Sequence, residues 1–243
     1  MKKFVITLAA LTFGAGGALA QDTTVRIASE GAYPPWNFIN DANELHGFER
    51  QLGDELCTRA ELTCEWVIND WDTIIPNLVA GNYDAIMAGM SVTEARQEVI
   101  SFTLEYRKPE PSSYVTLAGN DESVIDGVVA VQSNTIHAGY VAETDASLVE
   151  FPTPDETVAA VRSGEADAVL ANHSFLAPIV EQSNGELIIV GKISIGGGDA
   201  MGLRQSDDEL RETFDAAISE MRQDGSLNEL IAKWFGDDAE LLY

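Results

Sequence analysis

Basic residues are scarce in this 243-residue chain: 14 Lys and Arg stand against 40 Asp and Glu, a formal net charge of −26. Proteins that bind nucleic acid gain much of their affinity from basic patches that contact phosphates, so this composition argues against nucleic-acid binding. The chain is otherwise globular in composition and has no low-complexity tract. Its length suits either one large domain or two smaller ones.

Long apolar runs are absent except at the start of the chain. Two lysines precede an apolar run from Phe4 to Leu19, and Ala-Leu-Ala at 18–20 has the small residues that a signal peptidase recognises. We therefore expect residues 1–20 to be a signal peptide cleaved before Gln21, with the mature protein in the periplasm; an uncleaved anchor is the alternative. No later stretch approaches 18 apolar residues, so no second membrane span is predicted.

Cysteine is almost absent. Cys57 and Cys64 are the only two, and in an oxidising compartment we expect them to form one disulfide. Such a bond would join the end of an expected helix to a following strand and stabilise the fold by about 2 to 3 kcal/mol in the chain-entropy estimate. The three histidines, His46, His137 and His173, have no ligand-like spacing to these cysteines, so no metal site is expected.

Familiar catalytic motifs are absent as well. The chain has no G-x-S-x-G elbow, no Walker A loop, no G-x-G-x-x-G, no HExxH and no paired CxxC. The glycine run at 196–198 is more typical of a flexible connection than of a phosphate-binding loop, because no helix start follows at the right distance. The sequence therefore predicts neither an enzyme nor a cofactor.

Strand-like and helix-like segments alternate along the chain. This order is typical of an α/β fold with largely parallel sheets, whose ligands bind at the carboxyl ends of the strands. The expected strands are 24–28, 65–68, 83–88, 128–132, 148–151 and 166–171, and the expected helices are 48–60, 73–80, one from 135, 155–163, 207–224 and 227–235.

One helix–glycine–strand pattern occurs twice. AGNYDAIMA at 80–88 is echoed 83 residues later by SGEADAVLA at 163–171. Two copies of one unit suggest two similar lobes, each with its own sheet, and place Gly89 and Asn172 at matching strand ends. If the lobes face each other, these two residues border one cleft. The alternative is chance recurrence, because such units are common in α/β proteins.

One set of polar residues suits a carboxylate ligand. Ser91 and Arg96 follow the strand expected at 83–88, and Thr93 is placed to cap a short helix whose first turn holds the arginine. A guanidinium beside a hydroxyl and free backbone N–H groups is well suited to bind a carboxylate through two hydrogen bonds. A surface arginine paired with a glutamate is the alternative.

A second set suits a cation. Glu30 and Tyr33 follow the first expected strand, and Trp71 precedes the second expected helix. A carboxylate beside an aromatic plane attracts a cation by ion pairing and cation–π contact. Core packing is the alternative for the aromatic residues, and it is stronger for Trp36 than for Trp71.

Several short motifs, spread over most of the chain, occur together in one family of exported proteins. They are SEGAYPPWNF at 29–38, GFE at 47–49, DWDTIIP at 70–76, YDAI at 83–86, MSVTEAR at 90–96 and QDG at 223–225. With these motifs the sequence resembles the family 3 periplasmic solute-binding proteins, which serve ABC importers of polar amino acids. Within that family it is most similar to the lysine/arginine/ornithine, histidine and opine (octopine, nopaline) binders.

The resemblance implies a two-lobed periplasmic binding protein fold of type II. Such a fold has two sheets with flanking helices, joined by a hinge of two strands, and closes on its ligand. The first lobe is then expected to be discontinuous, with residues 21–108 and 196–243, and the second lobe to contain residues 109–195.

The resemblance also implies roles for individual residues. Arg96 and Ser91, helped by Thr135, match the family's contacts to the ligand α-carboxylate. Glu30 matches the acid that meets a cationic side chain in binders of basic amino acids.

The remaining pocket positions include one departure from the family. Tyr33 and Trp71 match aromatic walls, and Ala88 and Gly89 match positions that often carry Ser. At Asn172 the family usually has Asp, which pairs with the ligand α-ammonium, whereas opine binders have a neutral amide. The amide weakens the expectation of a plain L-amino acid, because opines carry a substituted amine.

The implied function is that of a solute-binding component of an ABC importer. The expected ligand is arginine, ornithine, lysine, histidine or an arginine-derived opine, delivered by a monomer to a permease in the inner membrane. Presentation of the bound ligand to a membrane receptor is not distinguished from delivery. Two alternatives stay open: a glutamine-type binder, and a cyclohexadienyl-dehydratase-like enzyme on the same fold with Glu30 as general acid.

Overall fold

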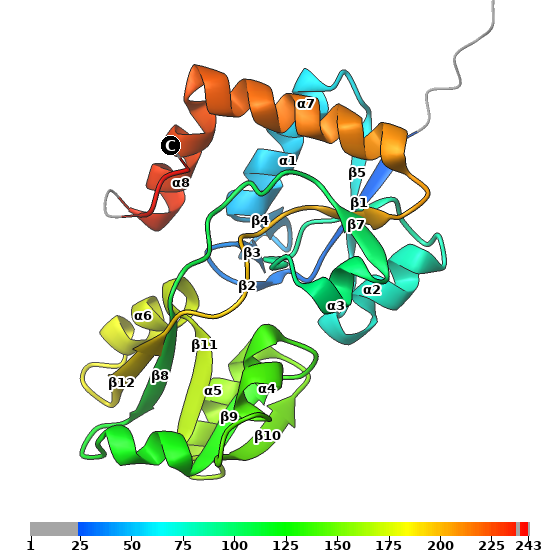
Figure 1. The fold of residues 1–243 in the computed structure, drawn as a ribbon. Coiled ribbons are helices and arrows are strands. Elements are labelled where there is room, and N and C mark those ends of the chain that lie inside the picture. Colours follow the sequence, from blue (N-terminus) through cyan, green and yellow to red (C-terminus); the bar gives the residue numbers. More distant parts are fainter. Residues whose placement is uncertain (1–23, 237–238, 243) are drawn as a thin grey trace, which may run out of the picture.

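Two five-stranded sheets, each flanked by helices, form two lobes, one above the other in Figure 1. The computed structural model describes residues 24–236 and 239–242. The predicted signal peptide, residues 1–20, and its cleavage site lie outside these residues. No helix in the described ranges is both long and apolar enough to cross a bilayer. The two sheets and their flanking helices confirm the predicted two-lobed α/β fold.

The sheet of the first lobe has the order β5-β1-β6-β13-β7. Strand β1 pairs parallel with β5 and β6, while β13 runs antiparallel to both of its neighbours. A separate small antiparallel sheet has the order β2-β3-β4. These strands are β1 (Val25–Ser29), β2 (Ala32–Tyr33), β3 (Asn37–Ile39), β4 (Leu45–His46), β5 (Cys64–Ile68), β6 (Ala85–Ile86), β7 (Ile100–Phe102) and β13 (Gly202–Arg204).

Helices cover both faces of this five-stranded sheet. Side chains of α1, α7 and α8 share a buried cluster with one face, and α2 shares another with the opposite face. Because successive side chains of a strand point to opposite faces, Val25 and Ile27 enter the first cluster and Ala28 the second. The helices are α1 (Phe48–Arg59), α2 (Trp71–Val79), α3 (Glu94–Gln97), α7 (Asp208–Asp224) and α8 (Ser226–Phe235).

The second lobe follows the same plan, with the strand order β10-β9-β11-β8-β12. Strand β9 pairs parallel with β10 and β11, and β8 runs antiparallel to β11 and β12. Helices α5 and α6 pack on one face, and α4 with η1 on the other. The elements are β8 (Ser112–Leu117), η1 (Glu122–Asp126), β9 (Val128–Gln132), α4 (Ile136–Val141), β10 (Ser147–Phe151), α5 (Pro154–Ser163), β11 (Ala168–Asn172), α6 (His173–Gln182) and β12 (Leu187–Ile193).

The internal echo of the sequence corresponds to equivalent units in the two sheets. Helices α2 and α5 are followed by Gly81 and Gly164, each with a positive φ, and lead into β6 and β11. Gly164 ends α5 in the left-handed conformation, which glycine adopts without a Cβ clash. Strands β6 and β11 both stand third in their sheets, so the residues after them occupy matching places.

The chain passes between the lobes twice, after β7 and after β12, and both passages are visible in Figure 1. The two passages run antiparallel and side by side. The Tyr106 N–H donates to the Asp199 carbonyl at 2.8 Å, and the Asp199 N–H donates to the Arg107 carbonyl at 3.0 Å. Gly198 permits this approach, because a Cβ there would collide with the Arg107 carbonyl oxygen and the Glu105 carboxylate.

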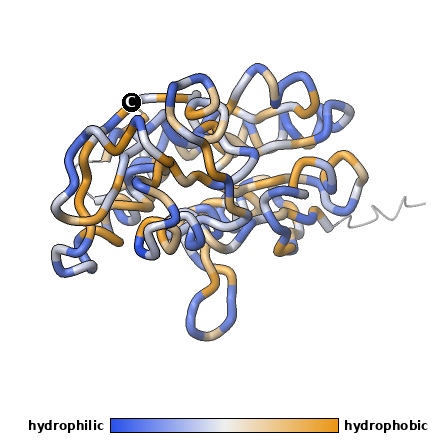
Figure 2. Tube along the Cα trace, turned by 90° about the horizontal axis from the view of Figure 1, so that it is seen from below, coloured by the Kyte–Doolittle hydropathy of each residue, from blue (hydrophilic) through white to orange (hydrophobic). Residues whose placement is uncertain are grey.

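Hydrophobic residues are concentrated inside the two lobes. Figure 2 shows hydrophobic segments within the lobes, whereas the loop that projects farthest at the lower edge is hydrophilic at its tip. The largest fully buried side chains include Trp36, Tyr106 and Phe214 in the first lobe and Phe175 in the second. Each lobe therefore has its own core.

The sequence locates the long helices better than the short strands. Helices expected at 48–60, 155–163, 207–224 and 227–235 agree with α1, α5, α7 and α8 to within one residue at each end. The strand expected at 83–88 contains only Ala85–Ile86, because its neighbours β1 and β13 pair with these two residues alone. Strands β7, β8, β12 and β13 and helix α6 carry no sequence prediction.

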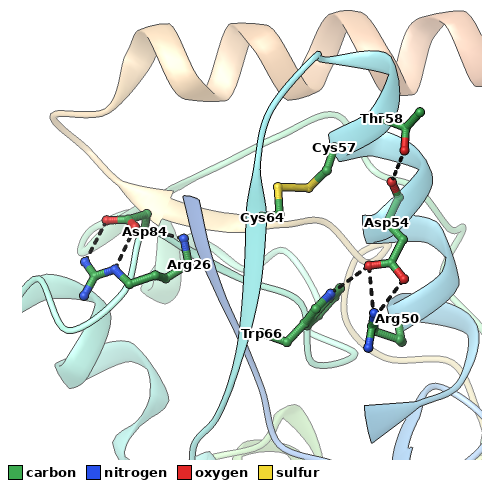
Figure 3. The surroundings of a disulfide bond; sticks show 8 residues. All are labelled: Arg26, Arg50, Asp54, Cys57, Thr58, Cys64, Trp66 and Asp84. Carbon is green, nitrogen blue, oxygen red and sulfur yellow. Dashed lines mark hydrogen bonds and ion pairs between the residues drawn. A yellow bond between two sulfur atoms is a disulfide. The ribbon is translucent and has the colours of Figure 1, made fainter. Parts of the chain in front are cut away.

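The predicted disulfide is confirmed. Cys57 lies near the end of α1 and Cys64 begins β5, and their sulfur atoms are bonded (Figure 3). Cys57 is buried in the cluster under α7. Nearby, Asp54 of α1 accepts a hydrogen bond from the Trp66 indole at 2.9 Å and pairs with Arg50. The disulfide and the Asp54–Trp66 hydrogen bond together attach α1 to β5.

Removing the disulfide should destabilise the first lobe. Replacing Cys57 and Cys64 together with Ala frees a short loop in the unfolded chain, so we expect a loss of about 2 to 3 kcal/mol in the free energy of unfolding. Urea unfolding followed by circular dichroism measures it. Reductant should lower the stability of the wild type and leave that of the double variant unchanged. Equal stability of the two proteins without reductant would contradict the expectation.

Candidate functional site

A cavity lies between the two lobes, at the carboxyl ends of β1, β6, β9 and β11. Side chains from both sheets line it, and all the residues that the sequence predicts for a ligand site are among them. These residues are Glu30, Tyr33, Trp71, Ala88, Gly89, Ser91, Arg96, Thr135 and Asn172.

Glu30 follows β1 directly, and its side chain is half-buried in the cavity. Its Oε1 accepts a hydrogen bond from Gln132 Nε2 at 2.6 Å. Burial raises the pKa of Glu30 to about 7; the Gln132 bond opposes this rise, and the carboxylates of Asp70, Asp72 and Glu49 add to it. No basic side chain in the described part of the chain forms an ion pair with this carboxylate.

Arg96 is held by its own loop. Thr93 caps α3 by accepting from the Arg96 N–H, and Arg96 Nη1 donates to the Ser91 carbonyl at 2.8 Å. The guanidinium lies 5.2 Å from the centre of the Trp71 ring, and Nη2 donates to the Asn134 carbonyl of the second lobe at 3.3 Å. Burial lowers the pKa of Arg96 to about 10, so the group stays charged at neutral pH. None of the described carboxylates pairs with it.

The cavity therefore holds two charges of opposite sign, and each has lost solvent without gaining an ion-pair partner from the described residues. A buried charge in this state is costly unless a further group compensates it. A molecule that carries both a carboxylate and a cationic group would compensate both Glu30 and Arg96 at once.

Ser91 connects the cavity to the second passage between the lobes. Its hydroxyl donates to Asp199 Oδ1 at 3.3 Å, while its carbonyl accepts from Arg96. Burial, with the charges of Glu110 and Glu49, raises the pKa of the Asp199 carboxyl well above its usual range, against the opposing effect of Arg107. The position of Ser91 thus depends on a carboxyl group of the passage itself.

Tyr33 and Asn172 meet across the lobes. The Tyr33 hydroxyl donates to Asn172 Oδ1 and accepts from the Asn172 N–H, both at 3.1 Å, and the Tyr33 ring stacks on Phe175 with centroids 4.5 Å apart. Asn172 Nδ2 donates to Glu110 Oε1 at 2.9 Å. The amide nitrogen of Asn172 is therefore engaged by Glu110, and its oxygen faces Tyr33.

A buried carboxylate, Glu49, supports the floor of the cavity on the first lobe. Its Oε1 accepts from the Gly89 N–H at 2.7 Å and from the Tyr106 hydroxyl, and its Oε2 accepts from Asn37 Nδ2 at 2.7 Å. Burial raises the pKa of Glu49, and these three donors oppose the rise. Gly89 has a φ of 58°, a left-handed conformation that suits glycine.

Sequence reasoning missed several residues that line the cavity. All of them come from the second lobe, and Gln132 could have been found from its place at a strand end near the predicted Thr135. The Thr135 hydroxyl caps α4 and donates to the Gln132 carbonyl at 2.7 Å. The additional lining residues are Gln132, Ile136, His137, Pro154, Thr157, Leu170 and Ala171.

His137 lines the cavity as a neutral side chain. Its Nε2 lies 2.9 Å from the Ser112 hydroxyl. Burial, with the nearby Arg96 charge, lowers the pKa of His137 to about 3, so the imidazole is uncharged near neutral pH. Within residues 24–236 and 239–242, no group of three or more His, Cys, Asp or Glu side chains is arranged to hold a metal ion.

The lobes also touch around the rim of the cavity. Asp72 Oδ1 of the first lobe accepts from the Ser133 hydroxyl at 2.6 Å and from Asn134 Nδ2 at 2.8 Å. On another side, the Trp36 indole donates to the Ser174 hydroxyl at 3.0 Å. These contacts, with those of Glu30 and Tyr33, show the two lobes in a closed arrangement.

The sequence and the structure match known proteins over nearly their whole length. The model of the bacterial extracellular solute-binding proteins, family 3, matches residues 25–237. The octopine-binding periplasmic protein of Rhizobium meliloti is 33% identical, with 96% of this chain and 97% of that protein covered. The lysine/arginine/ornithine-binding periplasmic protein of Escherichia coli is 28% identical, with 97% of each covered.

One solved structure is similar at higher identity. It is a periplasmic binding protein of the His/Glu/Gln/Arg/opine family from Silicibacter pomeroyi, in complex with lysine. That protein is 62% identical to this chain and superposes with a TM-score of 0.87, covering 89% of this chain and 99% of its own.

Replacing Glu49 with Gln should loosen the cavity floor. The amide has one acceptor oxygen and one donor nitrogen, so it cannot accept from Asn37 on one side and from Gly89 on the other. We expect a loss of about 1 to 3 kcal/mol in the free energy of unfolding, measured by urea denaturation. The exposed Glu44→Gln is the matched control; a Glu49→Gln variant as stable as this control would show that the three hydrogen bonds do not matter.

Proposed function

Because the chain belongs to family 3 of the bacterial extracellular solute-binding proteins, we propose that it binds a cationic amino acid or an arginine-derived opine in the periplasm. Arginine, ornithine, lysine and histidine are the amino acids considered. In this proposal residues 1–20 are removed as a signal peptide, and the mature monomer delivers its ligand to an ABC permease in the inner membrane.

The pair of unpaired charges in one closed cavity is the observation that supports this proposal. Glu30 provides the negative charge for the ligand's cationic end, and Arg96 provides the positive charge for its carboxylate. Trp71 lies against the Arg96 guanidinium, so its ring borders the space between the two ends. A neutral ligand such as glutamine would compensate Arg96 and leave Glu30 without a partner.

The remaining predicted residues receive positioning roles in the proposal. The Ser91 hydroxyl and the N-terminus of α4 behind Thr135 assist Arg96 at the ligand carboxylate, and Gly89 offers its backbone carbonyl to the ligand amine. Asn172 offers a neutral oxygen, which accepts a hydrogen bond from the Tyr33 hydroxyl. A neutral acceptor binds a primary or a substituted amine without requiring the full ion pair of the family's usual Asp.

Binding is proposed to shift the population from open to closed lobes. The ligand first meets the first lobe, which carries Glu30, Trp71 and Arg96, and the second lobe then closes over it. We place the lobe boundaries in the two passages, so that residues 21–108 with 196–243 form one lobe and residues 109–195 the other. The permease recognises the closed form. No chemical step is proposed, and turnover of a cyclohexadienyl substrate would contradict this assignment.

Ligand identity is tested by thermal shift with arginine, ornithine, lysine, histidine, glutamine, octopine and nopaline. A ligand at 100 times its dissociation constant should add about 2.7 kcal/mol of stability. Cationic compounds should shift the unfolding midpoint, and Arg96→Ala should abolish the shift because the ligand carboxylate loses its partner.

The control for this test is Arg162→Ala, since Arg162 pairs only with Glu186 on the surface of the second lobe. It should keep the full shift. Stabilisation by glutamine alone would show that Glu30 has another role, and binding that survives Arg96→Ala would remove Arg96 from the site.

The affinity for a cationic ligand should depend on pH through Glu30. In the closed arrangement its pKa is about 7, whereas a bound cation favours the ionised carboxylate. Below that pKa, binding must therefore release a proton, and the dissociation constant for arginine should be about tenfold or more higher at pH 5.5 than at pH 8. Calorimetry at both values measures it, and Glu30→Gln should bind weakly with no such dependence. A pH-independent wild type would contradict this linkage.

A further inference from the structure

Gln132 lies at the carboxyl end of β9 and faces Glu30 from the opposite lobe. Its Nε2 donates to Glu30 Oε1 at 2.6 Å and to the Pro152 carbonyl oxygen at 3.1 Å. Both partners are acceptors when Glu30 is ionised, so only the NH₂ end of the amide can satisfy them. The orientation of the Gln132 side chain is therefore determined by its surroundings.

This orientation occupies one oxygen of Glu30. The Gln132 residue is 8% exposed, so in the closed form its amide cannot turn out to solvent. Rotating the amide within the closed cavity would break the hydrogen bond between the Gln132 NH₂ group and the Pro152 carbonyl. A buried polar group that loses its hydrogen bond costs free energy. Glu30 Oε2, in contrast, accepts no hydrogen bond from any described residue.

The other acids near Glu30 do not offer a substitute. Asp72 accepts from Ser133 and Asn134, and Glu49 accepts from three donors on the first lobe. Neither of these carboxylates, nor that of Asp70, lines the cavity. The cationic end of a ligand consequently meets one free carboxylate oxygen.

Ammonium and guanidinium groups differ in how they use a carboxylate. An alkylammonium is a compact charge that is well served by a single oxygen, whereas a guanidinium binds best as a planar fork with two parallel hydrogen bonds to both oxygens. With Gln132 on Oε1, a guanidinium must either bind through one arm or displace the amide.

We propose that Gln132 is a specificity-determining residue, which makes the closed cavity prefer an alkylammonium side chain, as in lysine or ornithine, over a guanidinium. This inference rests on the function proposed above and narrows its ligand class. It assigns the selection to a residue of the second lobe that acts only when the lobes are closed.

The test compares dissociation constants for lysine, ornithine and arginine by calorimetry at pH 8, in the wild type and in Gln132→Met. Methionine fills a similar volume and donates no hydrogen bond, so both oxygens of Glu30 become free. We expect the wild type to bind lysine at least about tenfold more tightly than arginine, and the variant to lose most of this ratio through tighter arginine binding. Gln132→Asn, whose shorter amide does not reach Glu30 in the same way, should change the ratio in the same direction.

Ser133→Ala is the matched control, because it removes a contact between the lobes next to Gln132 without touching Glu30. It should weaken all three ligands alike and leave their ratio unchanged. A wild type that binds arginine as tightly as lysine overturns the inference alone, as does a Gln132→Met variant that folds with an unchanged midpoint and keeps the wild-type ratio. If neither a cationic amino acid nor octopine or nopaline binds the wild type, the proposed function is overturned as well.

Discussion

A charge that is withdrawn from water needs a partner, and this constraint governs the space between the lobes. Glu30 directly follows β1 and Arg96 lies in the short helix α3 after β6, yet both line the same cavity without an ion-pair partner among the described residues. In the closed arrangement, Glu30 accepts a hydrogen bond from one amide, that of Gln132. Arg96 donates to two carbonyl oxygens and lies near the Trp71 ring. The closed lobes thus enclose two charged groups that no described residue neutralises. A ligand with one positive and one negative group gains affinity by pairing with both of them.

The groups behind the cavity connect it to the passages between the lobes. Glu110, on the first passage, accepts from Asn172 and from Ser174 and pairs with Arg107 at 2.9 Å. Arg107 in turn lies over the Trp36 ring, with its Cζ 4.9 Å from the centroid. Because these contacts join both lobes to one passage, a change in lobe angle must alter the surroundings of Asn172. Closure and the shape of the site are consequently coupled through short hydrogen-bonded links.

The sequence predicted which residues line the cavity on the first lobe better than it predicted the groups that surround them. The carboxyl-end rule for parallel strands and the family motifs placed Glu30, Ser91 and Arg96 in the cavity, because the apolar segments before them, at 24–28 and 83–88, are easily recognised in the sequence. Strands β8 and β12 and helix α6 were not predicted: the apolar run 187–190 of β12 lacks the alternation of a strand, and Pro178 lies inside α6. Partners such as Gln132 and Glu49 could not be paired with site residues in advance, since the pairing arises from contacts between segments far apart in the chain.

The order of the strands has a consequence for how the chain acquires its structure. All strands of the second lobe come from one continuous stretch, β8 to β12, so that sheet can form as soon as Ile193 is available. In the first lobe, β13 lies between β6 and β7 in the sheet, although the whole second lobe separates it from them in the chain. Strand β7 pairs only with β13 among the described strands, so it has no neighbour in the sheet before β13 (Gly202–Arg204) is in place. The sheet of the first lobe therefore needs contacts between segments far apart in the chain, whereas the sheet of the second lobe needs only one continuous segment.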